Sequence, residues 1–160
     1  MGRVSTRASL GLGLELNDVF DRGNATQPGM DRAIVLGVVQ HDGPRPMVEY
    51  LNARLAATPE ILATAAPLKP TEVFRLAATC AEHKCPHFDG ADCRLATRVA
   101  NMLPPVVDSL PPCVIRKECR WYSQEGGAAC MRCPQITTVS YDLSAQTREV
   151  SGLPIMEDRL

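Results

Sequence analysis

All seven cysteines of this 160-residue chain lie in one part of the sequence, between Cys80 and Cys133. Two of the three histidines, His83 and His87, lie in the same stretch. Thiolates are soft ligands for zinc and iron–sulfur clusters, and such a site takes about four of them. The confinement of every thiol to one region predicts that they act together as metal ligands. The candidate ligands are Cys80, Cys85, Cys93, Cys113, Cys119, Cys130 and Cys133, with His87 as a further metal ligand.

The cysteines fall into two halves with the same order of residue types. The first half reads C-x4-C-x7-C and the second C-x5-C-x10-C-x2-C. In each half an aromatic residue and a glycine lie between the second and third cysteines, Phe88 and Gly90 in the first half. We interpret this as a degenerate repeat of about 35 residues in which both halves give thiolates to a shared centre. Alternatively, the halves are alike only because ligand loops need glycine.

The spacing favours an iron–sulfur cluster, of 4Fe-4S type, over zinc. Structural zinc sites are usually built from paired C-x2-C turns, and only Cys130 and Cys133 have that spacing. Iron–sulfur clusters accept irregular spacing, because the inorganic core sets its own shape. Cys85 and Cys133 are each followed by proline, a step that also ends the bacterial ferredoxin ligand run, although the rest of that run is absent. Zinc, and a protein without metal, are the alternatives.

Seven thiols exceed the needs of one site. One four-cysteine cluster with three spare thiols is the simplest count, and two sites arise if His87 or His83 supplies an eighth ligand. A site of three thiolates leaves an open position for a substrate. Three disulfides and one free thiol are a further alternative. Whether the protein is an enzyme is open, because no catalytic motif stands out beside the cysteines.

Composition excludes several classes of partner. A formal net charge of −1 gives no electrostatic reason to expect nucleic acid binding. No apolar run approaches the roughly 18 residues that a membrane-spanning helix needs, and the N-terminal residues do not resemble a secretory leader. We therefore expect a cytoplasmic protein without a membrane partner, in a compartment where thiols stay reduced.

The surrounding residues predict an α+β fold built from short elements. β-Branched residues predict strands at 33–39, 47–51 and 136–141, the first two joined as a hairpin through His41-Asp42-Gly43-Pro44. Capping signals and apolar spacing predict helices from Thr58 to about Ala65, from Lys69 to Cys80, and over residues 94–103. The expected architecture is a small antiparallel sheet packed with short helices around cysteine-rich metal-binding loops.

We expect a single cysteine-rich domain over residues 31–142, with its ligand region at 80–133. Residues 1–30 should form an N-terminal arm and residues 143–160 a polar C-terminal tail, and we expect both termini to be disordered or extended.

The leading functional hypothesis is a cytosolic iron–sulfur protein that carries electrons or senses oxidants for a partner protein. A zinc-stapled adaptor is the second hypothesis, because metal would supply folding energy that a core poor in aromatic residues lacks. An enzyme or accessory subunit with an open-site cluster is the third.

Overall fold

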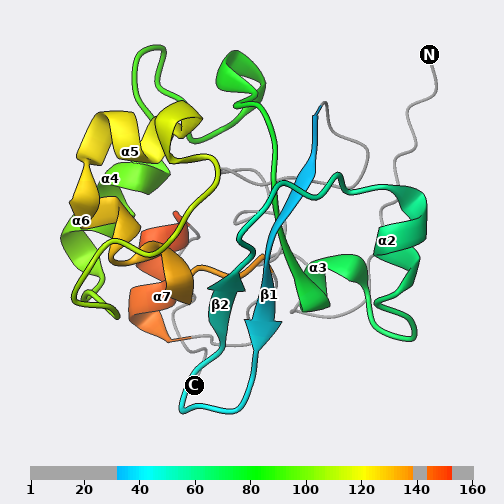
Figure 1. Ribbon diagram of the computed structural model, residues 1–160. Coiled ribbons are helices and arrows are strands. Elements are labelled where there is room, and N and C mark those ends of the chain that lie inside the picture. Colours follow the sequence, from blue (N-terminus) through cyan, green and yellow to red (C-terminus); the bar gives the residue numbers. More distant parts are fainter. Residues whose placement is uncertain (1–31, 139–143, 153–160) are drawn as a thin grey trace, which may run out of the picture.

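The computed structural model describes residues 32–138 and 144–152, which form a three-stranded antiparallel sheet beside a group of short helices (Figure 1). Strand order is β2–β1–β3, so β1 lies in the centre. The α+β class is confirmed. Residues 1–31, 139–143 and 153–160 lie outside the description, and with them most of the expected arm and part of the expected tail.

The predicted hairpin is confirmed. Strand β1 covers Ile34–Gln40 and β2 covers Met47–Tyr50, paired antiparallel with Val39 opposite Val48. Val35, Leu36 and Val39 are buried, as expected for a β-branched run that crosses a domain interior. The exposed turn residues between the strands include His41, which is therefore a loop residue as the sequence indicated. The hairpin places Tyr50 at the end of β2, where its side chain interacts with Cys133.

The third strand is not where we predicted it. Strand β3 is Phe74–Ala77, which pairs antiparallel with β1, whereas residues 136–138 form no strand and 139–141 lie outside the described residues. The predicted helix from Lys69 to Cys80 is therefore wrong beyond its first turn, α3 (Pro70–Val73). The apolar spacing of this segment fits a helix, but pairing with the open edge of β1 overrides that local preference.

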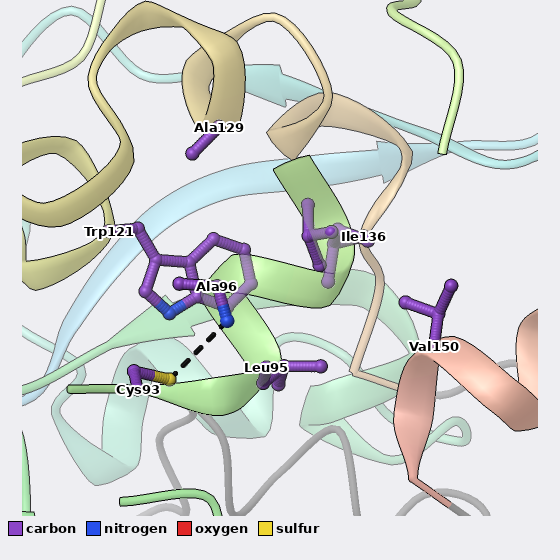
Figure 2. Packing of buried hydrophobic residues seen from close by; sticks show 8 residues of the cluster. Cys93, Leu95, Ala96, Trp121, Ala129, Ile136 and Val150 are labelled. Carbon is purple, nitrogen blue, oxygen red and sulfur yellow. Dashed lines mark hydrogen bonds between the residues drawn. The ribbon is translucent and has the colours of Figure 1, made fainter. Parts of the chain in front are cut away.

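Four helices gather on one side of the sheet in Figure 1: α4 (Arg94–Met102), α5 (Arg120–Glu125), α6 (Gly127–Cys130) and α7 (Ala145–Ser151). The predicted helix over residues 94–103 is confirmed as α4. Its buried face packs against the single tryptophan, Trp121, which is 3% exposed (Figure 2). The other buried members of this core are Cys93, Leu95, Ala96, Val99, Ala129, Ile136 and Val150.

Helix α7 lies in the segment expected to be a tail. The Ser144 hydroxyl accepts a hydrogen bond from the backbone N–H of Thr147 at 3.1 Å, and Gly152 ends the helix in the left-handed conformation. Val150 is 1% exposed, and its carbonyl accepts a hydrogen bond from Arg98 Nε of α4 at 2.6 Å. The segment has too few apolar residues to show a helical period, so the sequence did not reveal this contact.

The remaining elements are short. Helix α2 (Pro59–Ala63) confirms the start predicted at Thr58, whose hydroxyl accepts a hydrogen bond from the Ile61 N–H at 3.3 Å. Three 3-10 turns, η1 (Glu82–Lys84), η2 (Arg116–Glu118) and η3 (Cys133–Gln135), lie next to cysteines. None of the described helices has the length and apolar character needed to cross a membrane.

Gly37 in the central strand provides a test of the sheet. A Cβ atom at Gly37 would lie 2.4 Å from the Glu49 carbonyl oxygen of β2, whereas at Gly43 in the turn the nearest atom is 3.7 Å away. We expect Gly37→Ala to lower the free energy of unfolding by about 1–3 kcal/mol, because backbone must move to relieve the overlap. Gly43→Ala is the matched control and should change it little. Equal urea midpoints for the two variants would contradict this packing.

Candidate metal centre

The structure divides the seven cysteines into two groups that follow the two halves of the repeat. Cys113, Cys119, Cys130 and Cys133 line one small pocket between the sheet and helices α5 and α6, called here the four-cysteine pocket. Cys80, Cys85 and Cys93, called here the three-cysteine group, lie around the loop before α4 and are not among the residues that line that pocket. The two halves thus form separate groups, and the shared centre that we interpreted from the sequence stays a prediction.

Short helical elements position the thiols of the four-cysteine pocket. Cys119 is the N-cap residue of α5, Cys130 is the last residue of α6 and Cys133 is the first residue of η3. Pro134 follows in η3 and is buried, so the Cys-Pro step noted in the sequence begins a tight turn that packs toward β2. The positions of these three thiols therefore depend on where a short helix or turn begins or ends, whereas Cys113 lies outside the helices and strands.

The walls of the pocket are mostly apolar. Leu36 of β1, Trp121 and Ala129 enclose it, and the lining also includes Tyr50, Pro111, Ile115, Arg116 and Tyr122. The cavity between them has a volume of about 20 Å3. That volume is close to the space occupied by a single water molecule.

Burial raises the pKa of the Cys133 thiol to about 11, and neighbouring groups modify this effect. The nearby charge of Arg75 and a hydrogen bond from the Tyr50 hydroxyl oppose the increase. Burial likewise raises the pKa of Tyr50, and the neighbouring Cys133 adds to the effect, so the phenol keeps its proton and donates to the sulfur. Burial also raises the pKa of Cys119, against the influence of the backbone N–H groups of Tyr122 and Trp121.

Arg75 places a positive charge beside this pocket. It lies in β3, is 2% exposed, and its Nη1 donates to the Leu76 carbonyl at 3.0 Å. Its Nε finds no hydrogen-bond acceptor among the described residues. A buried guanidinium is costly without nearby negative charge, and Arg75 acts electrostatically on both Tyr50 and Cys133. Ionised thiols at the pocket would supply that charge.

Two further buried nitrogen donors belong to residues that line the pocket. Trp121 Nε1 and Arg116 Nε find no acceptor among the described residues. Buried N–H groups almost always have partners, so several unsatisfied donors around one pocket need an explanation. Sulfur atoms of thiolates or of a cluster are acceptors for such donors.

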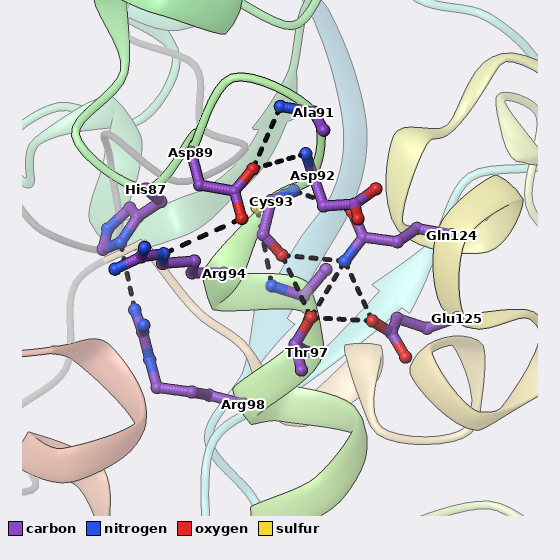
Figure 3. A network of polar contacts seen from close by, with 11 residues as sticks. His87, Asp89, Ala91, Asp92, Cys93, Arg94, Thr97, Arg98, Gln124 and Glu125 are labelled. Atoms are coloured by element: carbon purple, nitrogen blue, oxygen red, sulfur yellow. Dashed lines mark hydrogen bonds and ion pairs between the residues drawn. The ribbon is translucent and has the colours of Figure 1, made fainter.

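Helix α5 also holds the three-cysteine group. Arg120 Nε donates to Cys80 Sγ at 3.2 Å, and the Arg120 guanidinium lies over the Phe88 ring, 5.0 Å from its centroid. One turn later Gln124 binds the Cys93 backbone twice, accepting from its N–H at 2.7 Å and donating to its carbonyl at 2.9 Å (Figure 3). Arg120 and Gln124 lie four residues apart, on one face of α5.

The two histidines of the cysteine region have other partners. His87 is buried and its Nδ1 lies 3.0 Å from Arg98 Nη2 (Figure 3). Because a guanidinium only donates, Nδ1 is the acceptor and the proton of the neutral ring is on Nε2. His83 is exposed and packs edge-on against Phe88 with 5.1 Å between ring centroids. His87 as a metal ligand therefore stays a prediction.

The acidic residues near the cysteines have structural roles. Asp89 accepts hydrogen bonds from the backbone N–H groups of Ala91 and Asp92, which lower its pKa, and Glu125 accepts from Thr97 and Gln124. Within residues 32–138 and 144–152, no three His, Cys, Asp or Glu side chains stand in a ready metal-ligating arrangement. Metal binding at either group would therefore require the cysteine side chains to turn toward a common point.

Sequence reasoning missed Tyr50, Arg75 and Arg120, the residues that interact with the thiols. Arg75 had a signal, since it is a lone charge in the apolar run Val73-Phe74-Arg75-Leu76-Ala77. Tyr50 and Arg120 had none, because each meets its cysteine through contacts between distant parts of the chain.

No family model matches this sequence, and neither a curated protein nor a solved structure matches it. The case for a function therefore depends on the residues themselves.

The pKa of Cys133 predicts a pH dependence of stability in the metal-free protein. The folded state keeps this thiol proton up to about pH 11, whereas the unfolded chain loses it near the ordinary value of 9.0. The stabilisation is therefore complete below pH 9 and is lost as the pH rises toward 11. Between these limits we expect wild type to lose about 2–3 kcal/mol more than Cys133→Ser.

The measurement is urea unfolding with chelator and reductant present, at several pH values between those limits. Subtracting the stability of the serine variant from that of wild type removes the contributions of the other titrating groups. Parallel stability curves for the two proteins would show that the Cys133 thiol is not desolvated.

Proposed function

We propose that the protein is a small iron–sulfur protein whose cluster is held by Cys113, Cys119, Cys130 and Cys133, and that it carries electrons or senses oxidants for a partner protein in the cytoplasm. The observation that supports this most is the convergence of four cysteines, from separate turns, on one pocket beside a buried guanidinium. Four thiolates are the usual ligand set of a 4Fe-4S cluster.

The surroundings of the pocket suit a cluster with net negative charge. Arg75 supplies a positive charge. The side chains of Arg75, Trp121 and Arg116 each have a buried N–H group without an acceptor among the described residues, and these groups could donate to sulfur. Such donors and the burial of a site are the means by which a protein sets a cluster potential. The four cysteines are only partly buried as residues, so a centre held there would be near enough to the surface to exchange electrons with a partner.

A structural zinc site is the second candidate, and the size of the cavity favours it. About 20 Å3 accepts one ion between four sulfurs, whereas a 4Fe-4S core requires the pocket to expand. The helices around the pocket are short and begin or end at the ligands, so the expansion needs turns rather than long helices to move. We rank the cluster first because only one pair of ligands has C-x2-C spacing.

Metal analysis after anaerobic purification tests the proposal. We expect iron and sulfide in the protein, with the broad visible absorption of thiolate-bound iron. Cys119→Ser and Cys133→Ser should each lower the iron content and this absorption, while Ser109→Ala, an exposed control outside the pocket, should keep both. A colourless protein with zinc that unfolds on chelation selects the zinc candidate. Serine variants with unchanged metal contradict both.

Replacement of Arg75 should have different effects in the two states of the site. In the metal-free protein, Arg75→Met should leave the free energy of unfolding unchanged or raise it by about 1–4 kcal/mol, because a buried charge is removed. With a cluster bound, loss of this positive charge makes reduction harder, so the midpoint potential should fall by some tens of millivolts, an effect on the order of 1 kcal/mol.

The measurements are urea unfolding of the metal-free protein and redox titration of the loaded protein. Lys69→Met removes one positive charge from an exposed position and serves as the control. A potential that is the same for Arg75→Met and Lys69→Met would show that Arg75 does not act on a cluster.

A further inference from the structure

Backbone and side-chain contacts join the segments of the three-cysteine group to one another. The backbone bridge between Phe88 and Cys93 closes the loop before α4, and the Phe88 N–H donates to the Cys85 carbonyl at 3.2 Å. Cys93 Sγ caps α4 by accepting the Ala96 N–H at 3.5 Å (Figure 2). Arg120 ties Cys80 to this loop through the Phe88 ring and the Ala91 carbonyl. Phe88 and Arg120 thus join the segments that carry all three thiols.

The thiols of this group also act on one another. Cys85 and Cys80 both lie near enough to Cys93 to interact with it electrostatically. Arg120 provides the group with positive charge, as Arg75 does at the other pocket. Each group of thiols therefore lies beside its own guanidinium.

A larger cavity opens beside Cys80. Its volume is about 510 Å3, within the range of small-molecule sites. Both Cys80 and Cys119 line it, together with four basic residues and two acidic ones. Glu82 pairs with Arg120 at 3.0 Å and Glu118 with Arg54 at 2.8 Å, so both acids are matched and the lining keeps an excess of positive charge. The basic residues of this basic cavity are Arg32, Arg54, Lys117 and Arg120.

We propose that Cys80, Cys85 and Cys93 hold a second metal centre, whose fourth position faces the basic cavity and takes a small anion bearing carboxylate or phosphate. This rests on metal binding by the cysteine region but uses cysteines that the proposed function leaves out. The protein ligands nearest in sequence are engaged elsewhere: His87 accepts from Arg98, Asp89 binds the backbone of its own loop, and Glu82 pairs with Arg120. Three thiolates then leave one coordination position for an external ligand.

Metal content after anaerobic reconstitution distinguishes two centres from one. Cys93→Ser keeps a hydroxyl that can cap α4, so this variant should still fold. Cys80→Ser, at a partly exposed residue, is a second variant with less effect on packing. We expect either variant to lose the metal of the second centre only, and Cys119→Ser to lose the metal of the four-cysteine pocket only. Circular dichroism of the metal-free proteins checks their folding.

The outcomes separate the two proposals. Unchanged metal in both Cys80→Ser and Cys93→Ser overturns the second centre and leaves the four-cysteine site standing. Loss of all metal in every variant indicates one shared centre and overturns the second centre as well. Loss in the Cys80 and Cys93 variants, with none in Cys119→Ser, supports the second centre and contradicts the proposed function.

Citrate and inorganic phosphate probe the open position. Each is titrated into the reconstituted Cys133→Ser protein, whose remaining metal is in the three-cysteine group and whose replaced residue lies outside the cavity lining, and the metal spectrum is followed. We expect a saturable change with at least one of them, and about tenfold weaker binding when Lys117→Gln is added, since a charged hydrogen-bond donor is lost. Lys84→Gln, exposed and outside the cavity lining, is the control. No saturable change with either anion would overturn the open position.

Discussion

Burial of positive charge beside sulfur is the constraint on which the rest of this structure depends. Arg75 lies in the interior with one acceptor for Nη1 and none for Nε among the described residues. A guanidinium cannot relieve this by losing its proton, because it is always charged in proteins. Thiols can respond, since ionisation gives them the opposite charge. Protonated thiols leave this charge uncompensated, whereas thiolates would compensate it, so Arg75 favours ionisation of the neighbouring Cys133 thiol while burial of that thiol opposes it.

Local sequence signals predicted the helices and strands that are determined by residues close together in the sequence. The hairpin followed from β-branched residues and an Asp-Gly turn, and α2 and α4 from caps and apolar spacing. Strand β3 was missed because Phe74–Ala77 pairs with β1 across a long chain separation, a contact that outweighs the helical spacing. Helix α7 was missed because one apolar residue, Val150, anchors it. Contacts with residues distant in the sequence therefore determine both β3 and α7.

The candidate site shows the same division. Residue type and spacing singled out the cysteines and their two halves, because ligand chemistry resides in side chains that a sequence displays directly. The grouping into four and three depends on where α5, α6 and η3 begin and end. Those boundaries are set to within a residue, and the spacing of the cysteines does not reveal them. Tyr50 and Arg75 come from strands and reach the thiols only through the packing of the sheet against the helices. Their role is a property of the fold.

Helix α5 makes the two groups of cysteines parts of one arrangement. Its N-cap residue, Cys119, belongs to the four-cysteine pocket, and the next residue, Arg120, donates to Cys80 in the other group. Gln124, one turn further on the same face, fixes the Cys93 backbone, while Trp121 packs into the core and lines the four-cysteine pocket. A shift of α5 along its axis would therefore displace thiols in both groups together. The same helix of six residues therefore positions both groups of cysteines.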